Sequence, residues 1–171
     1  REAIATLDSV LAMMRRGGFT PVDSLLLMDL RAGYWLEQED YAQAAAELGR
    51  TERPLNAVLP ASHAGREVHA QLDAVLSLAQ RRYSEALKSF DTARRSQRQR
   101  MPDTHPEAAG AECGRGIALA RLGRSAEAVP LLRDQCARYR GYGLHMRLLV
   151  RWAGEVRSEI DTARSSASPT R

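Results

Sequence analysis

The sequence predicts an all-α fold, an array of antiparallel helix hairpins, and two observations lead to that prediction. A short motif, clearest at residues 82–93, recurs so that Ala44, Ala86 and Ala128 are each 42 residues apart. A fixed period between 20 and 50 residues is typical of repeat arrays. The composition agrees, because 44% of the 171 residues are hydrophobic, aromatics are 5% and alanine is abundant. Alanine has the highest helix propensity and lets helices pack closely.

The first predicted helix covers residues 2–15. Its apolar residues recur every three or four positions, which is the spacing of an amphipathic helix. They are Ile4, Leu7, Leu11 and Met14. Gly17 and Gly18 follow, where a helix C-terminal cap favours residues that tolerate positive φ. This helix copies the second half of the repeat, so we expect the chain to be a segment of a longer protein.

Three helix pairs are predicted after it. Thr20 and Pro21 begin the first pair, because threonine caps a helix and proline suits its first position. Ser62 and Thr104 follow Thr20 at the same 42-residue interval, so we expect them to begin the next two pairs. The predicted pairs are residues 21–38 with a helix from Tyr41, 67–80 with 83–96, and 108–122 with 125–139.

A last amphipathic helix lies outside the repeat. It is expected to cover the apolar face that the final pair leaves exposed. The tail from Ser165 has no apolar residues to bury and is predicted to be disordered. The predicted units are a leading helix (1–16), three repeats (20–55, 62–97 and 104–139), a C-terminal capping helix (144–164) and a disordered tail (165–171).

Three positions recur in every pair: a small residue in the first helix, an alanine twelve residues later and a large residue four further on. They are Ala32, Ala44 and Leu48, then Ala74, Ala86 and Phe90, then Gly116, Ala128 and Leu132. This pattern resembles tetratricopeptide (TPR) repeats, in the 42-residue form similar to that of kinesin light chain. The resemblance implies an α-solenoid whose hairpins wind into a right-handed superhelix. It also implies a bacterial, cytoplasmic signalling protein.

The resemblance further implies a function, which is binding a peptide or a partner domain in the concave groove. The first helix of each pair would line this groove. The expected groove residues are Leu26, Asp29, Gly33, Leu36, Val68, Gln71, Val75, Leu78, Gly110, Cys113, Ile117, Ala120 and Arg121. An equally weighted alternative is that they pack repeat against repeat or against the C-terminal helix, since apolar helix faces are usually core. Another function remains open, that of a sensing segment attached to a Ser/Thr kinase or a DNA-binding regulator.

Catalysis, metal binding and cofactor binding are not expected. The sequence contains no GxSxG, GxGxxG or GxxxxGK[ST] motif, and its four histidines share no metal-ligand spacing. Cys113 and Cys136 form no CxxC pattern, and we expect two reduced thiols in a helical core. The protein is therefore predicted not to be an enzyme and to need no cofactor.

Charge and hydropathy narrow the expected partners. A net charge of +4 is a mild excess, and the basic run at residues 94–100 contains no aromatic residues for stacking on bases. Nucleic acid is therefore not the expected partner. No run of 18 apolar residues exists, so no membrane span is predicted. A protein or peptide ligand is expected, and the C-terminal helix is a candidate for self-association.

Overall fold

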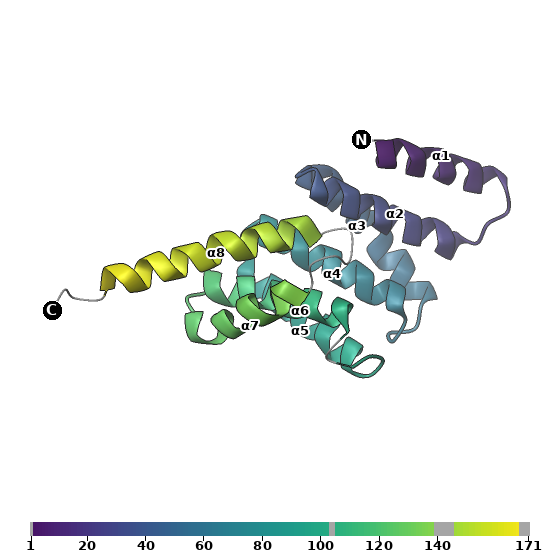
Figure 1. The fold of residues 1–171 in the computed structure, drawn as a ribbon. Helices are drawn as coiled ribbons and strands as arrows, with labels where there is room; N and C mark the ends of the chain where they lie inside the picture. The colour runs from purple at the N-terminus through teal and green to yellow at the C-terminus, as the bar shows by residue number, and fades with distance from the viewer. Residues whose placement is uncertain (1, 103–104, 139–145, 168–171) are drawn as a thin grey trace.

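The computed structural model describes residues 2–102, 105–138 and 146–167, and this part of the chain is folded into helices (Figure 1). The predicted all-α class is confirmed. The helices are α1 (Glu2–Arg16), α2 (Pro21–Glu37), α3 (Tyr41–Val58), α4 (Ala64–Ala79), α5 (Tyr83–Arg98), α6 (Pro106–Arg121), α7 (Ser125–Arg138) and α8 (Met146–Ala167).

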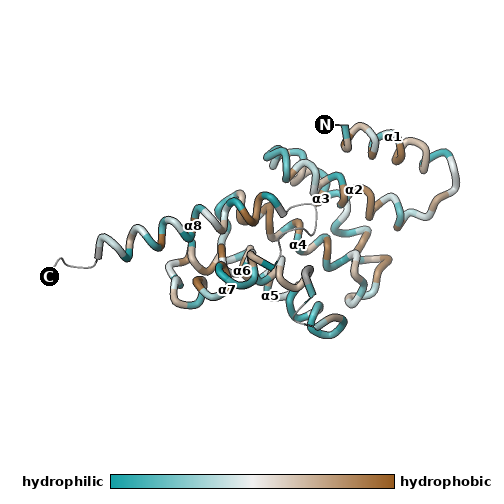
Figure 2. Tube along the Cα trace, in the orientation of Figure 1, coloured by the Kyte–Doolittle hydropathy of each residue, from teal (hydrophilic) through white to brown (hydrophobic). Residues whose placement is uncertain are grey.

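From α1 to α7, each helix packs against the next one along the chain. Helix α4 also contacts α2 and α6, so alternate helices lie side by side. Helix α8 leaves this order and packs on α2, α6 and α7 before it extends past the rest of the molecule (Figure 1). Apolar and polar residues are interspersed along the helices (Figure 2). The apolar faces of the helices meet in one main core.

The turn inside each predicted hairpin has the same geometry. Glu39, Arg81 and Gly123 have φ values of 60°, 60° and 78°, and they are 42 residues apart. The residue after each donates its N–H across the turn, from Asp40 to the Trp35 carbonyl at 3.0 Å and likewise in the other two turns. These bonds satisfy carbonyls that the helix end leaves without partners. The 42-residue period of the sequence is therefore also present in the backbone geometry of the turns.

Two of these turns carry a side chain in a conformation that favours glycine. Arg81→Gly is therefore expected to stabilise the protein by about 1 kcal/mol, because a left-handed conformation costs a residue with a Cβ about 1–2 kcal/mol. Gly123→Ala is the matched control and should destabilise by a similar amount. Urea unfolding of both variants measures the changes. Equal destabilisation in both variants would contradict the explanation.

The recurring small and large residues of the sequence pattern are buried at the helix crossings. Their relative exposures are at most 3%: Ala32, Ala44, Leu48, Ala74, Ala86, Phe90, Ala128 and Leu132. Gly116 is buried as well. Phe90 of α5 lies directly against α6, where a Cβ added to Gly114 would come within 2.2 Å of its ring. The pattern therefore marks packing positions.

One ion pair also recurs between neighbouring units. Arg31 of α2 pairs with Asp8 of α1, and Arg115 of α6 pairs with Asp91 of α5 at 2.6 Å. The two arginines are 84 residues apart, which is two periods. Each joins the first helix of a pair to the helix that precedes the pair. Sequence inspection missed this contact, which places α1 as the equivalent of α5.

The helix starts correct one prediction and confirm another. Thr20 caps α2 as expected, with its hydroxyl accepting the Asp23 N–H at 3.3 Å and Asp23 accepting the Thr20 N–H at 3.2 Å. Ser62 was the wrong cap for α4. The cap is His63, whose Nδ1 accepts the Gly65 N–H at 3.0 Å. Thr104 lies outside the described residues.

Some helix ends also differ from the prediction. Helix α3 continues through Pro54 to Val58, past the predicted end of the first repeat at residue 55. The prediction of a disordered tail was wrong for residues 165–167, which form the last turn of α8. Residues 168–171 lie outside the described part of the chain. No helix among the described residues is both long and apolar enough to cross a membrane.

The prediction of two reduced thiols was wrong. Cys113 of α6 and Cys136 of α7 form a disulfide, with Cα atoms 4.7 Å apart. Both residues are buried, at 0% and 5% exposure. No short sequence motif indicates this pair, because the two cysteines are 23 residues apart in sequence. Two helices of one hairpin bring them together.

Candidate interaction site

Most residues of the predicted groove are buried. Leu36, Val75, Leu78, Cys113 and Ile117 belong to the main hydrophobic core. Asp29, Gly33 and Gln71 are buried too, and Leu26 is half-buried against the start of α4. Val68 is 48% exposed, and Arg121 lies at the surface. The structure therefore brings most of these residues into one layer, where they pack against other helices.

Helix α8 supplies much of that packing. Leu148, Leu149, Ala153 and Val156 are at most 3% exposed and lie in the same core as Leu36, Leu78 and Ile117. Trp152 and Ile160 pack against this core and remain partly exposed. We call the surface formed by the C-terminal turns of α2, α4 and α6 the trough. The first half of α8 lies on the α2 and α6 parts of the trough and also packs on α7.

Polar contacts tie α8 to both ends of the trough. Near α2, Arg151 Nη1 is 2.7 Å from Glu39 Oε1. At α6, the Arg121 guanidinium donates to both carboxylate oxygens of Glu159, at 2.6 and 3.1 Å. Helix α8 thus spans from the first predicted repeat to the third.

Glu37 lies where α8 begins. Burial raises the pKa of its carboxyl, while the backbone N–H groups of Arg147 and Leu148 oppose this and favour the carboxylate. A carboxylate at a helix N-terminus satisfies N–H groups that have no partner within the helix. Glu37 therefore orients the first turn of α8 on the end of α2.

A cleft of about 430 Å³ remains between α8 and the C-terminal end of α4. Its exposed surface is mostly polar, although five helices contribute apolar or aromatic side chains to its lining: Tyr41, Leu78, Tyr83, Ile117 and Trp152. Its rim carries charges of both signs, from Arg81, Arg121, Glu155 and Glu159. Aromatic side chains beside charged ones are common where a protein surface binds a partner. The cleft is the open part of the trough.

A second groove, of about 650 Å³, lies between α3 and α5 with α4 at its base. We call it the outer groove. Charged side chains of both signs line it, among them Glu52, Asp73, Arg82 and Lys88. No sequence pattern indicated a site here, because these residues come from α3, α4, α5 and the turn before α5 and share no motif.

A buried polar cluster lies beneath the outer groove. His69 Nδ1 is 3.1 Å from both carboxylate oxygens of Asp29, and Thr51 Oγ1 donates to Asp29 Oδ1 at 2.5 Å. Asp29 is 1% exposed. It was expected to line the groove, but its side chain instead joins α2, α3 and α4 in the interior. His69 is half-buried within this cluster.

The charge state of His69 depends on this cluster. Burial by itself lowers the pKa of His69, but the hydrogen bond to Asp29 and the charges of Asp29, Asp73 and Glu52 outweigh burial and raise it. Burial also raises the pKa of Asp73, against the charges of His69 and Arg82. Protonated His69 therefore forms an ion pair with Asp29, which holds the first hairpin on α4.

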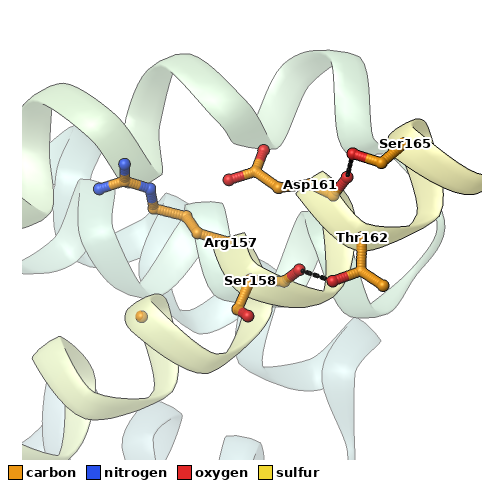
Figure 3. Close-up of a pocket in the computed structure, with 6 residues that line it drawn as sticks. Arg157, Ser158, Asp161, Thr162 and Ser165 are labelled. Atoms are coloured by element: carbon orange, nitrogen blue, oxygen red, sulfur yellow. Dashed lines mark hydrogen bonds between the residues drawn. The ribbon is translucent and has the colours of Figure 1, made fainter.

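The last turns of α8 extend past the rest of the protein (Figure 1). A shallow hollow there is lined by residues of α8 alone, including Arg157, Ser158 and Asp161 (Figure 3). Thr162 and Ser165 donate to the Ser158 and Asp161 carbonyls of the same helix, at 2.8 and 2.9 Å (Figure 3). These hydroxyls bond within the helix, so the hollow is ordinary helix surface.

The basic run at the end of α5 takes part in the fold. Arg94 pairs with Glu112 at 2.8 Å, and Arg100 pairs with Glu67. These contacts link α5 to α6 and the following turn to α4. Among the described residues, no group of three or more His, Cys, Asp or Glu side chains is arranged to hold a metal ion.

No protein-family model matches the chain, and no curated protein or solved structure is significantly similar to it.

Proposed function

We propose that this chain is a non-catalytic protein-interaction module of TPR-like helix hairpins, wound as a right-handed superhelix. The observation that carries the proposal is the trough, formed by the equivalent ends of α2, α4 and α6. Its first occupant is visible, since the amphipathic helix α8 lies on it with Leu149 and Val156 buried. Helix-in-groove binding uses the same apolar spacing in a partner. The ligand we propose is a protein segment.

The repeated turns support the TPR-like part of the proposal. Three turns with one geometry and one spacing, at Glu39, Arg81 and Gly123, give three equivalent units. Stacking equivalent units creates an extended binding surface in repeat proteins. A regulatory or scaffold role in signalling is the corresponding biological function.

The disulfide bears on where the module works. Disulfides persist in oxidising compartments and are rare in the cytosol, where thiols are kept reduced. The Cys113–Cys136 pair therefore favours an oxidising compartment over the cytoplasmic location that the family resemblance implies.

Selection from a phage-displayed library of 18-residue amphipathic helices tests the proposed function. We expect the selected peptides to bind about three- to fivefold more weakly to Arg121→Glu, because Arg121 lies at the exposed rim of the cleft, where a charge contact contributes up to about 1 kcal/mol. Lys88→Glu makes the same charge change in the outer groove and should alter affinity less than twofold. Fluorescence anisotropy measures both.

The opposite ranking, with Lys88→Glu losing the peptides and Arg121→Glu keeping them, would place the site in the outer groove. Leu36 and Leu78 are unsuitable for this test although both line the predicted groove. They are 0% and 5% exposed, so a glutamate at either position would unfold the core.

A further inference from the structure

Helix α8 has the form of a ligand for the surface it covers. Its apolar side chains Leu148, Trp152, Val156 and Ile160 recur every four residues and face the core. A partner helix in a groove uses the same spacing of anchors. The surface that α8 covers belongs to α2, α6 and α7, which come from two hairpins, and it does not depend on α8 for its turns.

The ion pairs between α8 and the rest of the protein are weak. The side chains of Arg121 and Glu159 are 31% and 57% exposed, and those of Arg151 and Glu39 are 47% and 50% exposed. Ion pairs this exposed contribute little to stability, because water and salt screen them. Glu37 at the start of α8 carries a burial penalty, which raises its pKa. Apolar contact over the first half of α8 is therefore what holds this helix.

That apolar contact is incomplete. The cleft of about 430 Å³ lies between Trp152 of α8 and the residues Leu78 and Tyr83. Close packing is the normal state of protein interiors, so an open cleft at this boundary shows that α8 does not fill the trough. The surface of this cleft is mostly polar, so a partner helix that reaches over the end of α4 would add polar and charged contacts there.

We propose that α8 is a built-in competitor and that the trough accepts a partner's amphipathic helix in its place. This inference rests on the proposed function and specifies its ligand. The partner helix carries apolar residues at four-residue intervals, as α8 does, and acidic residues positioned like Glu155 and Glu159. Arg81 and Arg121 at the cleft rim match that acidic charge. Binding of the partner exchanges one apolar helix for another, so the core stays covered.

Native-state hydrogen exchange of the full chain is the first test. If a partner helix can replace α8, then α8 must open without global unfolding of the protein. The amides of residues 149–156 should therefore show protection factors at least tenfold lower than those of α6. Amides in α8 that exchange only with global unfolding would overturn the inference. That result would leave the proposed function standing, because its test uses peptides and trough variants.

Binding of a fluorescein-labelled peptide of residues 146–167 to the full chain is the second test. Val156→Asp weakens the chain's own α8 and should tighten peptide binding at least tenfold. Trp152→Ala is a milder change and replaces Val156→Asp in this test if the Val156→Asp variant fails to fold. Arg121→Glu in the chain should weaken binding of the peptide. Glu159→Arg in the peptide should recover part of the lost affinity for that variant. Folded variants that do not bind the peptide would contradict the inference.

Light scattering of the unmodified chain separates a partner helix from a second copy. We expect a monomer mass from 1 to 100 µM, because α8 of each chain covers its own trough. A dimer that disappears in Val156→Asp would mean that two chains exchange α8. The second copy would then be the occupant, and the proposal as stated would be wrong.

Discussion

Replacing His69 with leucine is expected to lower the free energy of unfolding by about 3 kcal/mol. The Asp29 carboxylate is 1% exposed, and His69 Nδ1 lies 3.1 Å from both of its oxygens. Removing one partner of a buried pair leaves a buried charge without compensation, which typically costs about 3–5 kcal/mol. Thr51 still donates to Asp29, so the lower end of that range applies. Urea denaturation followed by circular dichroism measures the loss.

The double variant Asp29→Leu with His69→Leu is the control for this explanation. Replacing both partners by apolar groups removes the uncompensated charge and can be nearly neutral. We therefore expect the double variant to be more stable than His69→Leu alone. A double variant that loses the sum of the two single losses would show that Asp29 and His69 are not coupled.

The same cluster predicts a pH dependence above neutrality. The folded protein raises the pKa of His69 above its ordinary value of 6.5 through Asp29, with Asp73 and Glu52 adding to the effect. A raised pKa means that the stabilisation is complete below about pH 6.5 and is lost as the pH rises through the folded-state pKa. Stability should thus fall over an interval that begins near pH 6.5 and extends upward through the folded-state pKa of His69. The stability of His69→Leu should fall much less over that interval. An equal pH dependence of stability in the variant and the unmodified protein would exclude His69 as the cause.

Reducing the Cys113–Cys136 disulfide is expected to lower the free energy of unfolding by about 3 kcal/mol. The link closes a loop between residues 23 apart, and the chain-entropy relation for a loop of this length gives about 3 kcal/mol. For a chain of this size that loss corresponds to a melting temperature about 6–12 °C lower. Thermal melts with and without dithiothreitol measure the change.

The double variant Cys113→Ala with Cys136→Ala is the control for reduction. It should melt at the same temperature with and without dithiothreitol. Both cysteines are buried, so thiol titration after denaturation must confirm that the pair was reduced. An unchanged melting temperature in a sample proved to be reduced would show that the disulfide adds nothing to stability.

The helices and their order could be predicted from local pattern. Apolar residues spaced by three or four positions gave α1, and Thr20 with Asp23 gave the start of α2, because such signals depend on neighbours in sequence. Predicted helix ends differed where the local signal was ambiguous. The backbone entered α4 at His63 instead of Ser62, and the histidine ring took the capping role.

Contacts between distant residues could not be predicted in this way. The Asp29 and His69 pair crosses 40 positions, and its partners carry no motif. The cysteines have the spacing of neither a metal site nor a short disulfide motif. Which face of α2 would be buried was also open, because an apolar face fits both a ligand groove and a packed core.

The 42-residue repeat is what the sequence by itself determined, because helix propensity, caps and small-residue spacing act over a few neighbouring residues. It specified the turns at Glu39, Arg81 and Gly123 and the buried alanines at the crossings. The tertiary structure alone decided what covers the trough. Helix α8 lies on it because burying Leu149 and Val156 against α2, α6 and α7 removes apolar surface from water. That contact depends on the whole array being folded, so the sequence left packing against this helix as one of two alternatives for the groove residues.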